Sequence, residues 1–115
     1  MKIMLTVAVF AALASAPVLA DCVVPNGAVQ IPDGTLATKE EMLAAHKDLV
    51  AFDAAVKAYS DCLQQEQADK IAAGADKAKT EKKYAQLNNA QVEKVQALAD
   101  KFNAELKAYK AKSAG

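Results

Sequence analysis

The chain has 115 residues, with 14 basic residues, 14 acidic residues and a single histidine, so its formal net charge is zero. Every basic residue is a lysine, and the chain therefore lacks arginine, the side chain best suited to hold phosphate or carboxylate through two hydrogen bonds. This balance predicts neither a nucleic-acid partner nor binding to an anionic membrane surface.

Residues 1–20 have the features of a secretory signal peptide. Lys2 supplies a positive start, residues 3–14 form an apolar run, and Val18-Leu19-Ala20 offers small residues for cleavage. The alternative is an uncleaved membrane anchor, because the apolar run is nearly long enough to span a bilayer. Pro17 and the cleavage site favour removal. We therefore expect a mature chain that starts at Asp21, with 13 basic and 14 acidic residues, and that has no membrane span.

The two cysteines, Cys22 and Cys62, are expected to form a disulfide bond. Lipid attachment at Cys22 would require a small residue directly before it, and Asp21 fits that chemistry badly. A catalytic thiol would need a nearby base, but His46 is far from both cysteines in the sequence. Because disulfides form and persist in the compartments to which exported proteins go, the Cys22–Cys62 bond is the favoured interpretation.

Residues 21–37 are marked by prolines and glycines, which indicate turns and extended chain. The apolar residues between them are too many for a solvated linker: Val23, Val24, Val29, Ile31 and Leu36. We therefore expect an extended arm that packs against the rest of the protein.

A capping box opens the first expected helix, with Thr38 as its N-cap and Glu41 at the third helical position. Apolar residues then recur in steps of three and four, which describes one face of a helix. They are Met42, Ala45, Leu49, Phe52, Val56, Tyr59 and Leu63. The stripe stops there, and a polar, alanine-rich segment interrupted by Gly74 follows. The sequence predicts a helix over about 39–73.

A second stripe with helical spacing lies in the C-terminal part of the chain. Its members are Tyr84, Leu87, Val95, Leu98, Phe102, Leu106 and Tyr109. It weakens at Gln91, beside Val92. The sequence predicts a second helix over about 80–112 and a frayed end at 113–115.

Register and charge favour a hairpin over one continuous helix, although alanine and lysine in the middle would also permit the latter. Reflection about Gly74 brings Leu63 opposite Ala85, next to Tyr84, and Met42 opposite Leu106, so that the two stripes begin and end together. Residues 39–69 hold 3 lysines and 7 acidic residues, whereas residues 70–112 hold 10 lysines and 5 acidic residues. Antiparallel neighbours of opposite charge attract each other weakly.

The predicted fold is all-α: an antiparallel two-helix hairpin over residues 38–112, with an extended N-terminal arm fastened to the first helix by the disulfide. Sixteen residues separate Cys22 from Thr38 and can span up to about 53 Å when extended. The distance from Thr38 to Cys62 along a helix is only about 36 Å. The arm can therefore run back along the first helix. The sequence leaves open whether the arm completes a monomer or two hairpins pair into a four-helix bundle.

No residue set for catalysis, metal binding or cofactor binding can be assembled. The residues three and four positions from His46 that would have to share a metal with it are apolar, namely Met42, Leu43, Leu49 and Val50, so a surface histidine is expected. Haem ligation by His46 and Met42 would need a matching ligand on the facing helix, and the second helix offers none. We expect a protein that is not an enzyme and has no cofactor or metal.

The expected hairpin tip, residues 66–83, carries four lysines on an alanine-rich backbone: Lys77, Lys79, Lys82 and Lys83. One interpretation is a protruding surface that contacts a partner. The other, which is more common for runs of charge, is a solvated face that keeps the tip soluble.

The order of features resembles a group of short secreted, periplasmic helical proteins of Gram-negative bacteria for which no activity is known. The matching segments are Cys22 with Pro25, Ile31-Pro32-Asp33-Gly34, Tyr59-Ser60-Asp61-Cys62-Leu63, and Phe102-Asn103 with Tyr109. The resemblance implies export and a shared architecture. The expected role is a non-enzymatic structural or protein-interaction protein of the cell envelope, with a protein partner or self-association. The alternative is a small holdase-like periplasmic chaperone.

Overall fold

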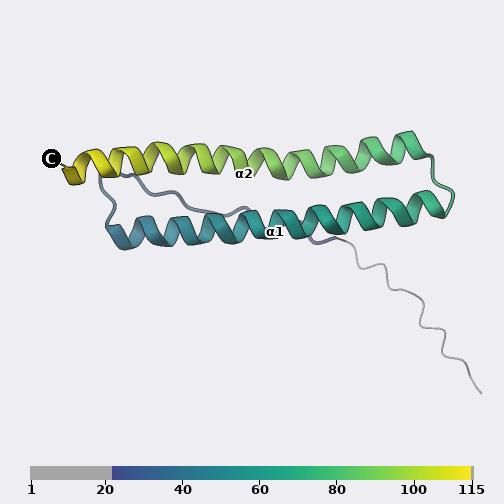
Figure 1. Ribbon diagram of the computed structural model, residues 1–115, viewed down its shortest axis with the longest axis horizontal. Coiled ribbons are helices and arrows are strands. Elements are labelled where there is room, and N and C mark those ends of the chain that lie inside the picture. Colours follow the sequence, from purple (N-terminus) through teal and green to yellow (C-terminus); the bar gives the residue numbers. More distant parts are fainter. Residues whose placement is uncertain (1–21, 115) are drawn as a thin grey trace, which may run out of the picture.

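The computed structural model describes residues 22–114 and shows two long helices that run side by side in opposite directions (Figure 1). Helix α1 spans Lys39–Ala72 and helix α2 spans Lys77–Ala114. The described part contains no strand. The predicted all-α hairpin is therefore confirmed, together with an N-terminal arm that a Cys22–Cys62 disulfide links to α1.

The signal peptide expected at residues 1–20 lies outside the described residues. Within residues 22–114, neither helix combines the length and the apolar character that crossing a membrane would require.

The start of α1 is fixed by the predicted cap. The Thr38 backbone is extended, and its hydroxyl accepts a hydrogen bond of 3.2 Å from the amide of Glu41. This bond satisfies one of the backbone donors that the first turn of a helix leaves without a partner. Glu40 and Glu41 also place negative charge at the positive end of the helix dipole.

The turn between the helices is a Schellman motif centred on Gly74. The Gly74 amide donates to the Ile71 carbonyl and the Ala75 amide donates to the Lys70 carbonyl, each at 3.0 Å. Gly74 has a φ of 102°, a conformation that side chains disfavour.

Helix α2 begins at Lys77, three residues before the predicted start at about 80. The reason is Asp76, which acts as an N-cap: its carboxylate accepts a 2.8 Å hydrogen bond from the amide of Lys79. Asp76 completes a very short connection, since only residues 73–76 separate the two helices.

Helix α2 also continues to Ala114, so residues 113 and 114, which were predicted to fray, are helical. The Lys112 ammonium donates a hydrogen bond of 3.1 Å to the Ala37 carbonyl and lies 5.6 Å from the centre of the Tyr109 ring. These contacts tie the last turns of α2 to the start of the hairpin.

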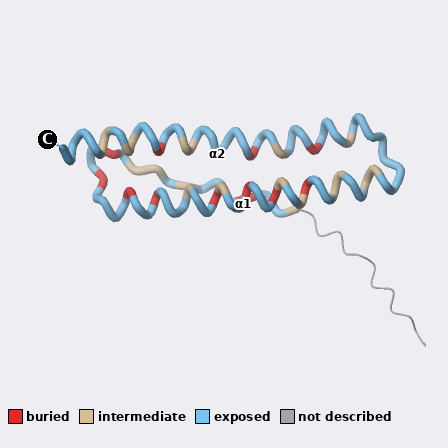
Figure 2. The backbone as a smooth tube through the Cα atoms, viewed as in Figure 1, coloured by how far each residue is buried: buried red, intermediate tan, exposed pale blue. Residues whose placement is uncertain are grey.

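The buried residues lie along the seam between the helices (Figure 2). The stripe predicted for α1 is confirmed, since six of its seven members are buried: Met42, Ala45, Phe52, Val56, Tyr59 and Leu63. The predicted register also holds. Leu63 clusters with Tyr84 near the tip, and Leu106 packs against the cluster of Met42 and Phe102 near the open end.

The stripe predicted for α2 is correct except at Leu87, since its other members are buried or half-buried. Leu87 is 38% exposed, whereas Gln91 is buried and Asn88 is half-buried. The seam of α2 follows a seven-residue repeat, in which Asn88 is one repeat from Val95 and Gln91 is one repeat from Leu98. Leu87 lies one repeat from Lys94, on the flank of α2 that faces the arm, where the Lys94 side chain approaches Gly27.

Candidate interaction surfaces

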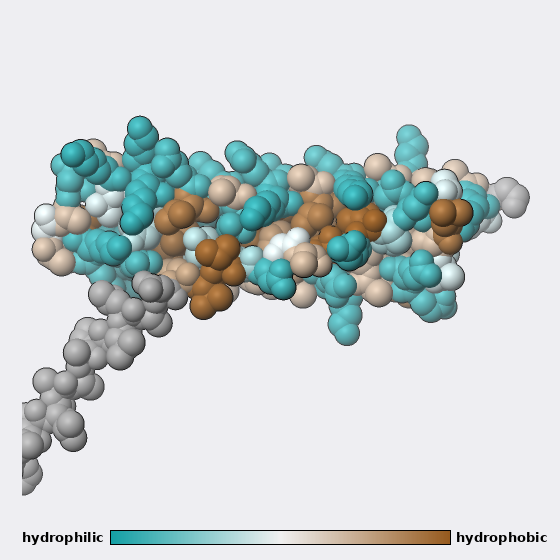
Figure 3. All heavy atoms as spheres, turned by 180° about the vertical axis from the view of Figure 1, so that it is seen from behind, coloured by the Kyte–Doolittle hydropathy of each residue, from teal (hydrophilic) through white to brown (hydrophobic). Residues whose placement is uncertain are grey.

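The arm, residues 22–37, occupies one side of the groove between the helices. Gly27 lies against the Phe52 ring of α1 and the aliphatic part of Lys94 of α2, while Ile31 packs on the cluster that includes Met42 and Phe102. The flank of α1 beneath the arm is lined by small residues, which leave room for it: Ala51, Ala55 and Ala58. Hydrophobic residues, drawn in brown, gather along the middle of the face shown in Figure 3.

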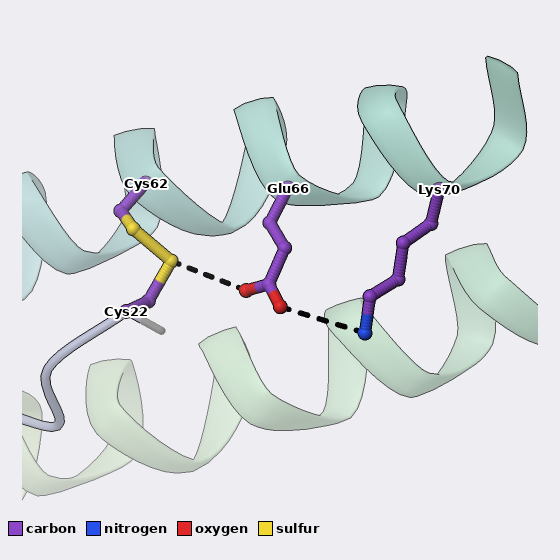
Figure 4. The surroundings of a disulfide bond; sticks show 4 residues. All are labelled: Cys22, Cys62, Glu66 and Lys70. Carbon is purple, nitrogen blue, oxygen red and sulfur yellow. Dashed lines mark hydrogen bonds and ion pairs between the residues drawn. A yellow bond between two sulfur atoms is a disulfide. The ribbon is translucent and has the colours of Figure 1, made fainter. Parts of the chain in front are cut away.

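The disulfide fastens the start of the arm to α1 (Figure 4). The Cα atoms of Cys22 and Cys62 are 5.7 Å apart, within the usual range for a disulfide. No free cysteine is present in residues 22–114. The predicted pairing is confirmed, and such a bond is typical of an oxidising compartment.

A half-buried carboxylate sits beside the disulfide. One Glu66 oxygen lies 3.3 Å from the Cys22 sulfur, and the other lies 3.5 Å from the Lys70 ammonium, so the side chain bridges the two (Figure 4). Since a disulfide sulfur carries no hydrogen, the first contact is not a donated hydrogen bond. Glu66 and Lys70 are four residues apart on α1, which is the ordinary spacing of a helical ion pair.

The Lys70 ammonium also lies 5.6 Å from the centre of the Tyr84 ring on α2. The pKa of Lys70 is raised above its ordinary value, first by Tyr84 and then by Glu66, while partial loss of water opposes the shift. Lys70 is therefore a charged link across the seam. Because its ammonium stays protonated at neutral pH, Lys70 is not a candidate general base. We interpret it as a structural contact.

The four tip lysines all lie in the first two turns of α2, where their side chains are exposed. Lys77 forms only a loose pair with Glu81, at 3.8 Å, and Lys83 lies 5.7 Å from the centre of the Tyr84 ring. The arm does not reach this end of the hairpin, because it joins α1 at Cys62 and runs from there toward the open end (Figure 1). The structure thus brings the four lysines together at the end of the hairpin that residues 22–37 leave uncovered.

His46 is exposed, as predicted, and its ring lies 5.7 Å from that of Phe102. Within residues 22–114, no group of three or more histidine, cysteine, aspartate or glutamate side chains is arranged to hold a metal ion.

The side of the seam away from the arm is an open face with shallow grooves. A groove of about 350 Å³ at the open end is almost entirely apolar, and its walls include Leu43, His46, Phe102 and Leu106. Further grooves follow toward the tip, of about 330 Å³ and 270 Å³. Three large apolar side chains on this flank are exposed, Leu43 at 58%, Val50 at 54% and Val92 at 36%.

Two carboxamides in the seam of α2 were not predicted as part of a site. The side-chain oxygens of Asn88 and Gln91 are buried and accept no hydrogen bond within the described part of the chain. The weakening of the apolar stripe at Gln91 was the only signal in the sequence, and it did not identify Asn88.

Comparison of the chain with protein families, with curated proteins and with solved structures finds no match.

Proposed function

We propose that this chain is a non-enzymatic structural or protein-interaction protein of the cell envelope, exported to the periplasm. The Cys22–Cys62 disulfide supports an oxidising compartment, and the signal-peptide pattern of residues 1–20 supports export.

The observation that carries the interaction role is the end of the hairpin that residues 22–37 leave uncovered. The arm clamps the other part of the seam, so the tip projects beyond it on two straight helices (Figure 1). The four lysines at the start of α2 are held in a fixed helical array and have one loose ion pair among them. A basic array on a preformed helix fits an acidic patch on another protein, because the backbone loses little conformational freedom on binding.

The test is photo-crosslinking in the cell. A photoreactive phenylalanine at Lys79 samples the tip, and the same residue at exposed Lys107, near the other end of α2, is the matched control. A discrete protein that crosslinks to position 79 at reproducible stoichiometry, and not to position 107, supports the proposal. Equal crosslinking from both positions, or none from position 79, contradicts it.

The alternative role is a holdase, and the exposed apolar side chains of the open face favour it. Such a surface could hold an unfolding client through contacts that need no specific geometry. Light scattering by an aggregating client protein tests this role, with Leu43→Lys as the variant that should lose suppression. If the chain at a stoichiometric ratio does not slow aggregation, the holdase role is wrong.

A further inference from the structure

The open face carries a regular pattern that the arm does not cover. On α2, every seventh residue of this flank is apolar: Ala85, Val92, Ala99 and Leu106. On α1, the corresponding residues are apolar near the open end, at Leu43 and Val50, and polar toward the tip, at Lys57 and Gln64. Large apolar side chains that stay exposed at a helical repeat are typical of a surface that packs against another protein.

The residues of these two rows lie at matching heights along the hairpin. Leu43 lines the same groove as Leu106, and Lys57 lines the same groove as Val92. Near the tip, Gln64 shares a groove with Ala85. Since the rows share a seven-residue repeat, Val50 is level with Ala99.

We propose that the open face is a dimer interface, on which a second copy of this chain packs about a two-fold axis parallel to the helices, forming a four-helix bundle with both arms on the outside. Rotation about such an axis leaves the height along the helices unchanged. Leu43 therefore meets the partner's Leu106, and Val50 meets the partner's Ala99. Val92 comes level with the partner's Lys57, whose aliphatic stem can cover it.

Charge favours this axis over the alternative. Helix α1 holds 4 lysines and 7 acidic residues, a net −3, while α2 holds 9 lysines and 4 acidic residues, a net +5. About the parallel axis, each α1 lies antiparallel to the oppositely charged α2 of the partner. A two-fold axis perpendicular to the helices would instead place α2 against its own copy, and would bring Leu43 and Val50 level with the polar tip half of the other subunit.

The first test is the mass of the disulfide-bonded chain in solution, measured by sedimentation over a range of concentrations. We expect a dimer that Val92→Lys weakens by at least about tenfold. Leu87→Lys is the matched control, because Leu87 has nearly the same exposure, 38% against 36%, on the flank of α2 that faces the arm side. Leu43→Lys is a second interface variant at a more exposed position. Circular dichroism checks that each variant keeps its helices.

The second test measures the distance between the two tips by pulsed electron paramagnetic resonance, with a spin label on Ala73→Cys, at an exposed position of the turn, attached after the native disulfide has formed. The parallel axis places both tips at one end, within roughly 30 Å, because packed helices lie about 8–10 Å apart. The perpendicular axis would separate the tips by about 50 Å, the length of a 34-residue helix. A monomer, a long tip-to-tip distance, or a dimer lost with Leu87→Lys but kept with Val92→Lys overturns the proposal. The inference rests on the open face and not on the proposed role of the tip, so its failure would leave that role untouched.

Discussion

Gly34 in the arm lies directly against the backbone of Glu105 in α2. Its amide donates a hydrogen bond of 2.6 Å to the Glu105 carboxylate, and a Cβ atom on Gly34 would overlap the Glu105 carbonyl oxygen. Among the described residues only Gly74 has a positive φ, so Gly34 is required by the close approach of two backbones and not by its conformation. The arm is thus held to α1 at Cys22 and to α2 at Gly34.

We expect Gly34→Ala to lower the free energy of unfolding by about 1–3 kcal/mol, the usual range for forcing an extra group into a packed contact. The arm would have to move away from α2 and would lose the hydrogen bond to Glu105. Urea unfolding followed by circular dichroism measures the change.

Gly27→Ala is the control for this variant. A Cβ atom on Gly27 would meet the Phe52 ring at 3.5 Å, an ordinary contact, and the glycine has no positive φ. The substitution should be neutral or should stabilise the chain by about 0.4–1 kcal/mol, because alanine has fewer unfolded conformations than glycine. If the two alanine variants lose the same stability, the close contact of Gly34 with Glu105 does not matter.

Loss of the disulfide should free the arm and largely melt the fold. The bond closes a sequence separation of 40 residues, which corresponds to about 4 kcal/mol in the chain-entropy model. Thermal unfolding with and without reductant measures the loss. The double variant Cys22→Ala/Cys62→Ala should match the reduced protein and should not respond to reductant. An unchanged melting temperature on reduction would refute this prediction.

The sequence predicted the features that depend on local chemistry or on one clear period. Thr38 was identified as a cap by its type and by Glu41 three residues later, and the α1 stripe from Met42 to Leu63 had a single consistent spacing. The disulfide followed because Cys22 and Cys62 have only each other as partners. The register followed because both stripes had to begin and end together.

The features that the sequence did not predict depend on how segments meet. From Tyr84, a step of three gives Leu87 and a step of four gives Asn88; hydrophobicity favoured the first, and packing against α1 selects the second. The early start of α2 was missed because the capping role of Asp76 was not recognised in a polar segment. The contact of Gly34 with Glu105 joins residues 71 positions apart, which no local pattern reports. The tip lysines stay a prediction as a contact surface.

Gln91→Leu should raise the free energy of unfolding by about 1–2 kcal/mol. Gln91 is 6% exposed, and its side-chain oxygen has no partner in the described part of the chain. Leucine has a similar volume and removes the cost of burying an unpaired acceptor. Gln86→Leu, at an exposed position on the same helix, is the control and should change stability by less than about 0.5 kcal/mol. A destabilising Gln91→Leu would show that the carboxamide is satisfied by a group outside the described residues, such as bound water.

The carboxylate of Asp33 should make the free energy of unfolding depend on pH in the acidic range. It accepts hydrogen bonds from the Thr35 hydroxyl at 2.7 Å and from the Thr35 amide at 2.9 Å. These bonds, the hydroxyl first, hold the pKa of Asp33 below its ordinary value of 3.8; the charge of Lys112 acts weakly in the same direction, and partial loss of water opposes it.

Because the pKa is lower in the folded chain than in the unfolded chain, this contribution is fully present above the ordinary pKa of 3.8 and is lost as the pH falls through the lower folded value. Asp33→Asn, which mimics the protonated side chain, should therefore lower the melting temperature near neutral pH, and its difference from the unmodified chain should vanish in strong acid. Thermal unfolding across this pH range measures both curves. Asp61→Asn, at an exposed position of α1, is the control. Curves for Asp33→Asn and the unmodified chain that stay parallel into strong acid would contradict the role of the ionised carboxylate.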